Sequence, residues 1–164
     1  LEHYLDEKNV RLFTETGIYS EIEMNSHYDI KLEKYAHVLN IEVETMLEMI
    51  NKDILPAAFK YMFDISRTVI NLKSVVPNAK ASAGSALLLK LDGLVNKLAE
   101  KKEELSLKHA DAKAAGNVMK IARAYADSVV PLMAETRAVA DEIEPLLGES
   151  YKPFPVYEDL LFKI

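Results

Sequence analysis

Two pairs of residues have types and a spacing that suit metal binding: Glu23 with His27, and Glu33 with His37. Residues four apart lie on the same face of a helix, so the carboxylate and the imidazole of each pair can approach one ion. Carboxylate-bridged di-iron bundles instead use Glu-x-x-His, at a spacing of three, on two helices, together with an inward-facing Glu from each of two others. Neither pair has that spacing, so the sequence favours surface ion pairs and helix-dipole contacts over a metal site.

An acidic cluster, Glu42, Glu44 and Glu48, offers carboxylates of the kind used in acid–base catalysis. Glu44 and Glu48 have no histidine near them in the sequence, and such clusters are more typical of the solvated face of a helix. His3 and His109 stand among charged residues, and we expect both at the surface.

Nucleophiles and phosphate-binding loops are not indicated either. The chain has no cysteine, which excludes thiolate catalysis, thiolate zinc ligands and disulfides. Ser82, Ser85 and Ser128 have no base nearby in an identifiable motif, and Gly84 and Gly93 are isolated, so there is no glycine-rich phosphate loop. The sequence therefore predicts no catalytic, cofactor-binding or metal-binding residue in this chain.

Length and charge restrict the class of protein and its partners. A chain of 164 residues suits one domain, and its net charge of −6 argues against nucleic-acid binding, which needs a basic face. No apolar run approaches the roughly 20 residues of a membrane span. The chain begins at Leu1 without a signal-peptide core, so we expect a cytoplasmic piece of a longer polypeptide.

The elements that must position these residues are few and long, because only 5 glycines and 6 prolines interrupt the chain. A short helix is expected over residues 1–14, before Gly17. Ser20 and Glu23 form a capping-box pattern, which predicts that a second helix begins there and runs to about residue 39.

The longest helix is expected to begin at a cap on Asn40 and to end at residues 76–78. Its apolar residues recur every three or four positions, and Pro56 inside this stripe predicts a kink rather than a break. A third helix is expected over residues 87–105. Its turn Lys101–Glu104 has no apolar residue, so we expect it to project into solvent or to form a hairpin tip.

After a turn within residues 110–116, a fourth helix is expected over residues 118–146, with a kink at Pro131 and a left-handed stop at Gly148. These patterns predict an all-α fold. It is an antiparallel bundle of about four helices, two of them long, that occupies residues 1–150.

The last residues, 151–164, have a different character. Pro153 and Pro155 favour an extended backbone, yet the segment is rich in aromatic residues. We therefore expect an extended docking tail, with Phe154 and Phe162 as anchors.

Two stretches of sequence have a specific likeness. The first passes through Glu21-Ile22-Glu23, Ser26 and Tyr28 to Asp53-Ile54-Leu55-Pro56-Ala57, and the second is Pro153-Phe154-Pro155-Val156-Tyr157-Glu158-Asp159-Leu160-Leu161-Phe162. Together they resemble the C-terminal region of type III glutamine synthetases, the large bacterial class. In that family a Glu-x-Glu-x-x-Ser-x-Tyr helix leads into an Asp-Ile-Leu-Pro-Ala helix. The chains of that family end in a Pro-Phe-Pro-x-Tyr-x-Asp-Leu-Leu-Phe tail.

The resemblance implies part of a homo-oligomeric ligase that joins ammonia to glutamate with ATP and Mg²⁺ or Mn²⁺. In that family the nucleotide, metal and glutamate sites belong to an upstream catalytic domain, so this chain would be a structural domain that braces the catalytic domain and contacts neighbouring subunits. Two other functions are compatible with a helical bundle: a free-standing protein-interaction module, and a carboxylate-bridged metal bundle with redox or storage activity. The missing Glu-x-x-His pairs count against the metal bundle.

Overall fold

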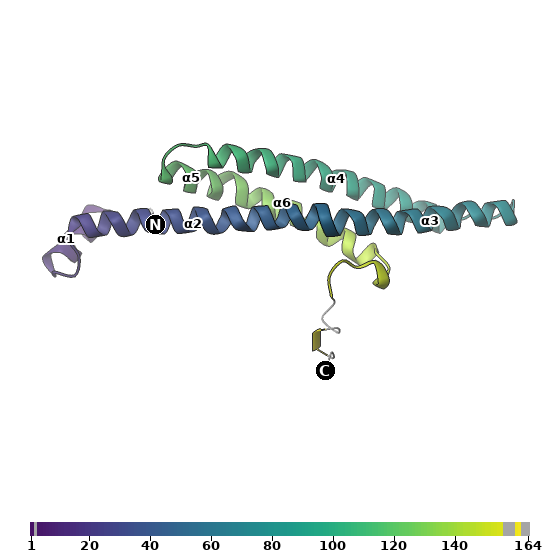
Figure 1. Cartoon of the computed structure of the whole chain (residues 1–164), viewed down its shortest axis with the longest axis horizontal. Coiled ribbons are helices and arrows are strands. Elements are labelled where there is room, and N and C mark those ends of the chain that lie inside the picture. The colour runs from purple at the N-terminus through teal and green to yellow at the C-terminus, as the bar shows by residue number, and fades with distance from the viewer. Residues whose placement is uncertain (2, 156–159, 162–164) are drawn as a thin grey trace. The chain divides into compact units, whose positions relative to one another are not determined.

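The computed structural model describes residues 1, 3–155 and 160–161, and this part of the chain is helical and contains no strand (Figure 1). The predicted all-α fold, a bundle of about four helices with two long ones, is confirmed. The two long helices are α2 and α4, of 29 and 32 residues. The α-helices are α1 (Glu7–Glu15), α2 (Glu21–Met49), α3 (Leu55–Val75), α4 (Ser82–Lys113), α5 (Val118–Ala124) and α6 (Val130–Ile143).

Four shorter helical elements accompany them. Two are five-residue π-helical turns, η1 (Ile50–Ile54) and η2 (Tyr125–Val129), and two are 3₁₀ turns, η3 (Glu144–Leu146) and η4 (Glu149–Tyr151). Much of the predicted aromatic tail, including the expected anchor Phe162, lies outside the described residues. The other expected anchor, Phe154, is partly buried. None of the helices in the described part of the chain is long and apolar enough to cross a membrane.

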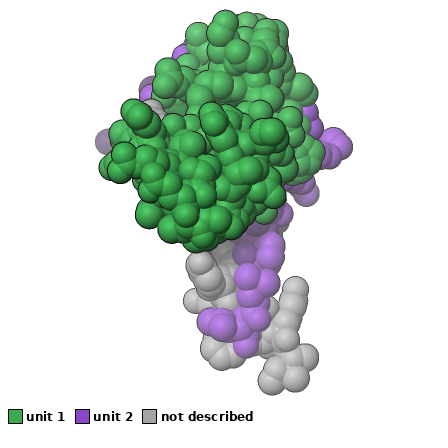
Figure 2. All heavy atoms as spheres, turned by 90° about the vertical axis from the view of Figure 1, so that its left-hand side faces the viewer, with its two compact units in different colours: residues 1–43, 107–131 green, residues 44–106, 132–164 purple. Residues whose placement is uncertain are grey.

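The chain forms two compact units, each built from two separate stretches of sequence (Figure 2). Unit 1 consists of residues 1–43 and 107–131, and unit 2 consists of residues 44–106 and 132–164. The division of the chain into a bundle over residues 1–150 and a docking tail over residues 151–164 stays a prediction.

The capping box at the start of α2 has the predicted form. The backbone N–H of Ser20 donates to Glu23 Oε2 at 2.7 Å, and the backbone N–H of Glu23 donates to Ser20 Oγ at 3.3 Å. The hydrogen bond from the Ser20 backbone, with a second from its hydroxyl, lowers the pKa of the Glu23 carboxyl. Two backbone donors at the helix terminus are thereby satisfied, which fixes where α2 begins.

Replacing Ser20 with alanine is expected to lower the free energy of unfolding by about 1 kcal/mol, because the N-terminus of α2 loses its cap. Chemical denaturation followed by circular dichroism measures the change. Ser26→Ala is the matched control: Ser26 is exposed inside the same helix, where alanine is the better helix former. The difference in the free energy of unfolding between wild type and Ser20→Ala should also decrease as the pH falls through the lowered pKa of Glu23, since protonation removes the carboxylate that accepts the bonds. An equal effect of the two substitutions would contradict this role for Ser20.

The predicted helix break at Asn40 is wrong. Asn40 lies inside α2, which continues to Met49. Leu39 and Val43, on either side of it, are buried. The apolar face of the helix therefore passes through this position without interruption, and its packing outweighs the tendency of asparagine to cap a helix.

Both internal prolines follow a π-helical turn. Pro56 is the second residue of α3, directly after η1, and Pro131 is the second residue of α6, directly after η2. A proline in a regular α-helix clashes with the carbonyl four residues earlier, which here belongs to Lys52 and Asp127. Each of these two residues is the middle residue of its π turn. The wider π turn thus accommodates the proline, and the helical backbone continues on both sides.

The core of unit 2 is formed by apolar side chains from η1, α3, α4 and α6. Its buried members are Ile50, Leu55, Ala58, Leu91, Val95, Leu98, Val139, Ile143 and Leu147. Near the start of α4, Gly84 permits a close approach of α3, because a Cβ there would lie 2.8 Å from Val69 Cγ2. The left-handed stop predicted at Gly148 is wrong: this residue has φ −61°. Its missing side chain instead leaves room for the rings of Tyr61 and Tyr151.

Unit 1 has a separate and smaller cluster in which Tyr28 and Leu32 of α2 pack with Ala122 of α5. Tyr4 stacks on Tyr28 with 6.1 Å between the ring centroids. The turn between α4 and α5 falls at the end of the predicted range, and Gly116 there adopts a φ of +103°, which favours glycine.

Candidate functional site

The side chains of the two Glu–His pairs have different surroundings in the structure. The Glu23 carboxylate accepts the bonds of the capping box, and the His27 ring packs edge-on against Tyr19 at 4.9 Å between centroids. Glu33 and His37 are both exposed on α2. Among the described residues, no three histidine or acidic side chains are grouped so that they could hold an ion.

We therefore expect the purified chain to bind no stoichiometric transition metal. Elemental analysis after dialysis checks this directly, because a closed site needs three or four ligands and each pair supplies two. About one metal per chain, lost in both His27→Ala and His37→Ala, would contradict the prediction.

The acidic residues Glu42, Glu44 and Glu48 are all exposed, as expected for a solvated helix face. Glu48 forms an ion pair with Lys52, and the hydrogen bond from Lys52 to this carboxylate raises the pKa of the Lys52 ammonium. Glu48 is thus engaged with a basic side chain at the surface.

The surface position predicted for His109 is wrong, whereas His3 is exposed and lies 3.0 Å from Asp6. His109 is 7% exposed, and its Nδ1 lies 3.3 Å from the hydroxyl of the buried Tyr125. The two rings meet edge-to-face at 5.9 Å between centroids. The charged neighbours of His109 in the sequence suggested a surface position. Tyr125 lies in the apolar pattern of its helix, and a buried tyrosine hydroxyl usually has a hydrogen-bond partner, which His109 provides.

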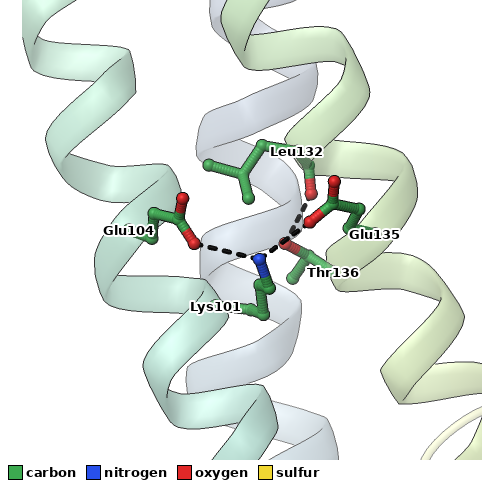
Figure 3. Close-up of polar contacts among 5 residues, drawn as sticks. All are labelled: Lys101, Glu104, Leu132, Glu135 and Thr136. Atoms are coloured by element: carbon green, nitrogen blue, oxygen red, sulfur yellow. Dashed lines mark hydrogen bonds and ion pairs between the residues drawn. The ribbon is translucent and has the colours of Figure 1, made fainter.

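The turn Lys101–Glu104 is not a hairpin tip, because α4 passes through it as one helix. Its two glutamates are exposed, as expected for a turn that projects into solvent, but its two lysines are partly buried. Lys101 Nζ lies between two carboxylates, Glu104 on α4 at 3.0 Å and Glu135 on α6 at 2.7 Å (Figure 3). The hydrogen bonds to Glu135 and then to Glu104 raise the pKa of the Lys101 ammonium. Next to Glu135, the buried Thr136 donates to the carbonyl of Leu132 at 2.7 Å. These charged residues therefore connect two helices of unit 2.

Tyr151 fixes the segment after α6 to α3. Its hydroxyl donates to Asp64 Oδ2 at 2.6 Å, and its ring packs against Tyr61 at 4.9 Å between centroids. The hydrogen bond to Asp64 raises the pKa of the Tyr151 hydroxyl. The sequence placed Tyr151 in a docking tail but gave no indication of which residues would receive it.

Large apolar side chains lie exposed along one face of α3. Phe59, Phe63 and Ile70 retain 56%, 58% and 65% of their surface, and their spacings of four and seven place them on one side of the helix. In unit 1, Ile30, Val38 and Ile41 form a similar exposed face on α2, with spacings of eight and three. Single exposed apolar residues are ordinary, but aligned ones are typical of interaction surfaces.

The fold and its surfaces define an all-helical domain that presents apolar helix faces. Comparison with known proteins shows which proteins the chain is similar to. A family model described as glutamine synthetase C-terminal domain matches residues 1–73. A glutamine synthetase of Butyrivibrio fibrisolvens is 32% identical over 167 residues, which cover 100% of this chain and 23% of that protein. The type-3 glutamine synthetase of Dictyostelium discoideum is 27% identical over 160 residues, which cover 95% of this chain and 22% of that protein.

The chain is thus similar to the glutamine synthetase C-terminal domain over residues 1–73, and to these two glutamine synthetases over nearly its whole length, as the two matching stretches of sequence predicted. It spans less than a quarter of the length of these two relatives.

Proposed function

We propose that this chain is the structural assembly domain of a cytoplasmic type III glutamine synthetase. In this proposal the longer enzyme joins ammonia to glutamate with ATP and Mg²⁺ or Mn²⁺, and its catalytic domain lies outside these residues. The chain braces that domain and contacts neighbouring subunits of a homo-oligomer.

The observation that carries the proposal is the exposed face of α3 with Phe59, Phe63 and Ile70. Full burial of a large apolar side chain is worth roughly 1.5–3 kcal/mol, so leaving three of them in water is unfavourable unless another surface covers them. The similarity to two glutamine synthetases supports the same role, because these relatives are more than four times as long as the matched region. Among the described residues there is no cluster of metal ligands, which supports placing the ATP and metal sites elsewhere in the enzyme.

The test is the double substitution Phe59→Ser/Phe63→Ser in the full-length enzyme, with sedimentation velocity as the measurement. We expect the variant to dissociate into smaller species, because two apolar contacts are replaced by polar side chains. Leu89→Ser is the control, since Leu89 is 76% exposed on α4 and is not on this face.

We also expect the 164-residue chain alone to form no glutamine from glutamate, ammonia, ATP and Mg²⁺. Unchanged assembly of the double variant, or turnover by the chain alone, would overturn the proposal.

A further inference from the structure

Unit 1 contains a cavity of about 510 Å³ that opens to solvent. This volume is within the range that accommodates a small ligand or a few side chains. The walls come from α2, α5 and η2, with the start of the chain at the edge. The lining residues are Leu1, Tyr28, Leu32, Tyr35, Met119, Ala122, Arg123, Ala126 and Asp127.

Apolar side chains line the buried part of the cavity, and its exposed edge carries one charge of each sign. Leu32 and Ala122 are buried, and the Tyr28 hydroxyl lies 3.6 Å from the sulfur of Met119. Arg123 and Asp127 are exposed, four residues apart. Neither forms an ion pair with another residue in the described part of the chain. A complementary ligand therefore has an apolar surface flanked by an acidic and a basic group.

The end of this chain has that composition. Asp159 and Lys163 are four residues apart with the signs opposite to those of Arg123 and Asp127, and Leu160, Leu161 and Phe162 lie between them. Leu160 and Leu161 are 65% and 71% exposed, so this chain does not cover them itself. The other residues of 156–164 lie outside the described residues.

We propose that the C-terminal segment, residues 156–164, of a second copy of this chain docks into the unit 1 cavity. Leucine and phenylalanine side chains contact the buried apolar residues of the cavity, Asp159 pairs with Arg123, and Lys163 pairs with Asp127. The inference rests on the proposed assembly function and assigns one contact between subunits to a particular surface and a particular partner segment.

The experiment measures binding of a fluorescent peptide, residues 153–164, to the full chain and to a chain ending at Lys152. We expect saturable binding to both chains. Binding to the chain that ends at Lys152 should be tighter, because no tails of other copies compete with the peptide for the cavity. Ala126→Trp fills the cavity mouth from an exposed position and should weaken binding at least tenfold. Ala110→Trp, at an exposed position of α4 in the same unit, is the control and should bind like wild type.

A charge reversal provides the second test. Arg123→Asp should weaken binding of the wild-type peptide. A peptide with Asp159→Arg should bind to the Arg123→Asp variant as the wild-type peptide binds to the wild-type chain. Absence of saturable binding, or equal binding by the two tryptophan variants, would overturn the proposal. Binding only to the shortened chain, with a monomeric full chain in sedimentation, would place the tail in its own cavity and would also overturn it. In each of these cases the assembly role still stands if Phe59→Ser/Phe63→Ser dissociates the full-length enzyme, so the two failures are distinguishable.

Discussion

Leu98→Ala is expected to lower the free energy of unfolding by about 2–5 kcal/mol, because it removes a fully buried side chain and leaves a cavity in the core. Leu98 has 0% exposure and lies among the apolar residues that α3, α4 and α6 contribute to unit 2. Urea denaturation followed by circular dichroism measures the change. Since the chain has two compact units, the effect should appear in the transition of unit 2 if the units unfold separately.

Leu89→Ala provides the control for that measurement. Leu89 lies on the same helix but is 76% exposed, so the same change of side chain should alter stability by less than about 0.5 kcal/mol. If the two substitutions had equal effects, Leu98 would not be a core residue and the packing described for unit 2 would be wrong.

A chain that ends at Ser150 is expected to be less stable, with a melting temperature lower by about 5 °C or more. The truncation removes Tyr151, which packs on Tyr61 and bonds to Asp64, together with the partly buried Phe154. In the full-length enzyme the same truncation should weaken assembly, as measured by sedimentation velocity.

Tyr151→Phe separates the hydroxyl from the rest of the tail. It should destabilise the chain less than the truncation, because the ring against Tyr61 remains. The pKa of Tyr151 is raised by Asp64, so its contribution is present below the unfolded value near 10 and is lost as the pH rises through the folded value. The difference between wild type and Tyr151→Phe should therefore be constant from about pH 7 to 9 and decrease above about pH 10. If the full-length enzyme truncated after Ser150 assembles and melts like the intact one, the tail has no structural role.

Features governed by neighbouring residues could be predicted from the sequence. The capping box of Ser20 and Glu23 is local, because its hydrogen bonds join residues three apart. The long helices followed from apolar periodicity, and Gly17 follows α1 with a φ of +67°, consistent with its predicted role as a breaker. The family could be recognised because its motifs lie in the first third of the chain and at its end.

Features governed by distant residues could not be predicted. Whether His109 is exposed depends on Tyr125, which lies on another helix, and whether Lys101 projects into solvent depends on Glu135 of α6. Asn40 has the residue type of a cap, but the packing of its neighbours Leu39 and Val43 keeps it inside α2. The partner of Tyr151 likewise follows only from the arrangement of α3 in unit 2.

The π turns before Pro56 and Pro131 also have a consequence for sequence change. A π turn is equivalent to one inserted residue in an α-helix, and the insertion rotates the following residues by about 100°. Deleting one residue within η1 would restore a regular helix but would bring the ring of Pro56 against a carbonyl. Replacing the proline alone would leave the extra residue of the π turn in place although no proline ring requires it. In evolutionary terms, each proline and the extra residue before it form a linked pair, which is expected to be gained or lost together.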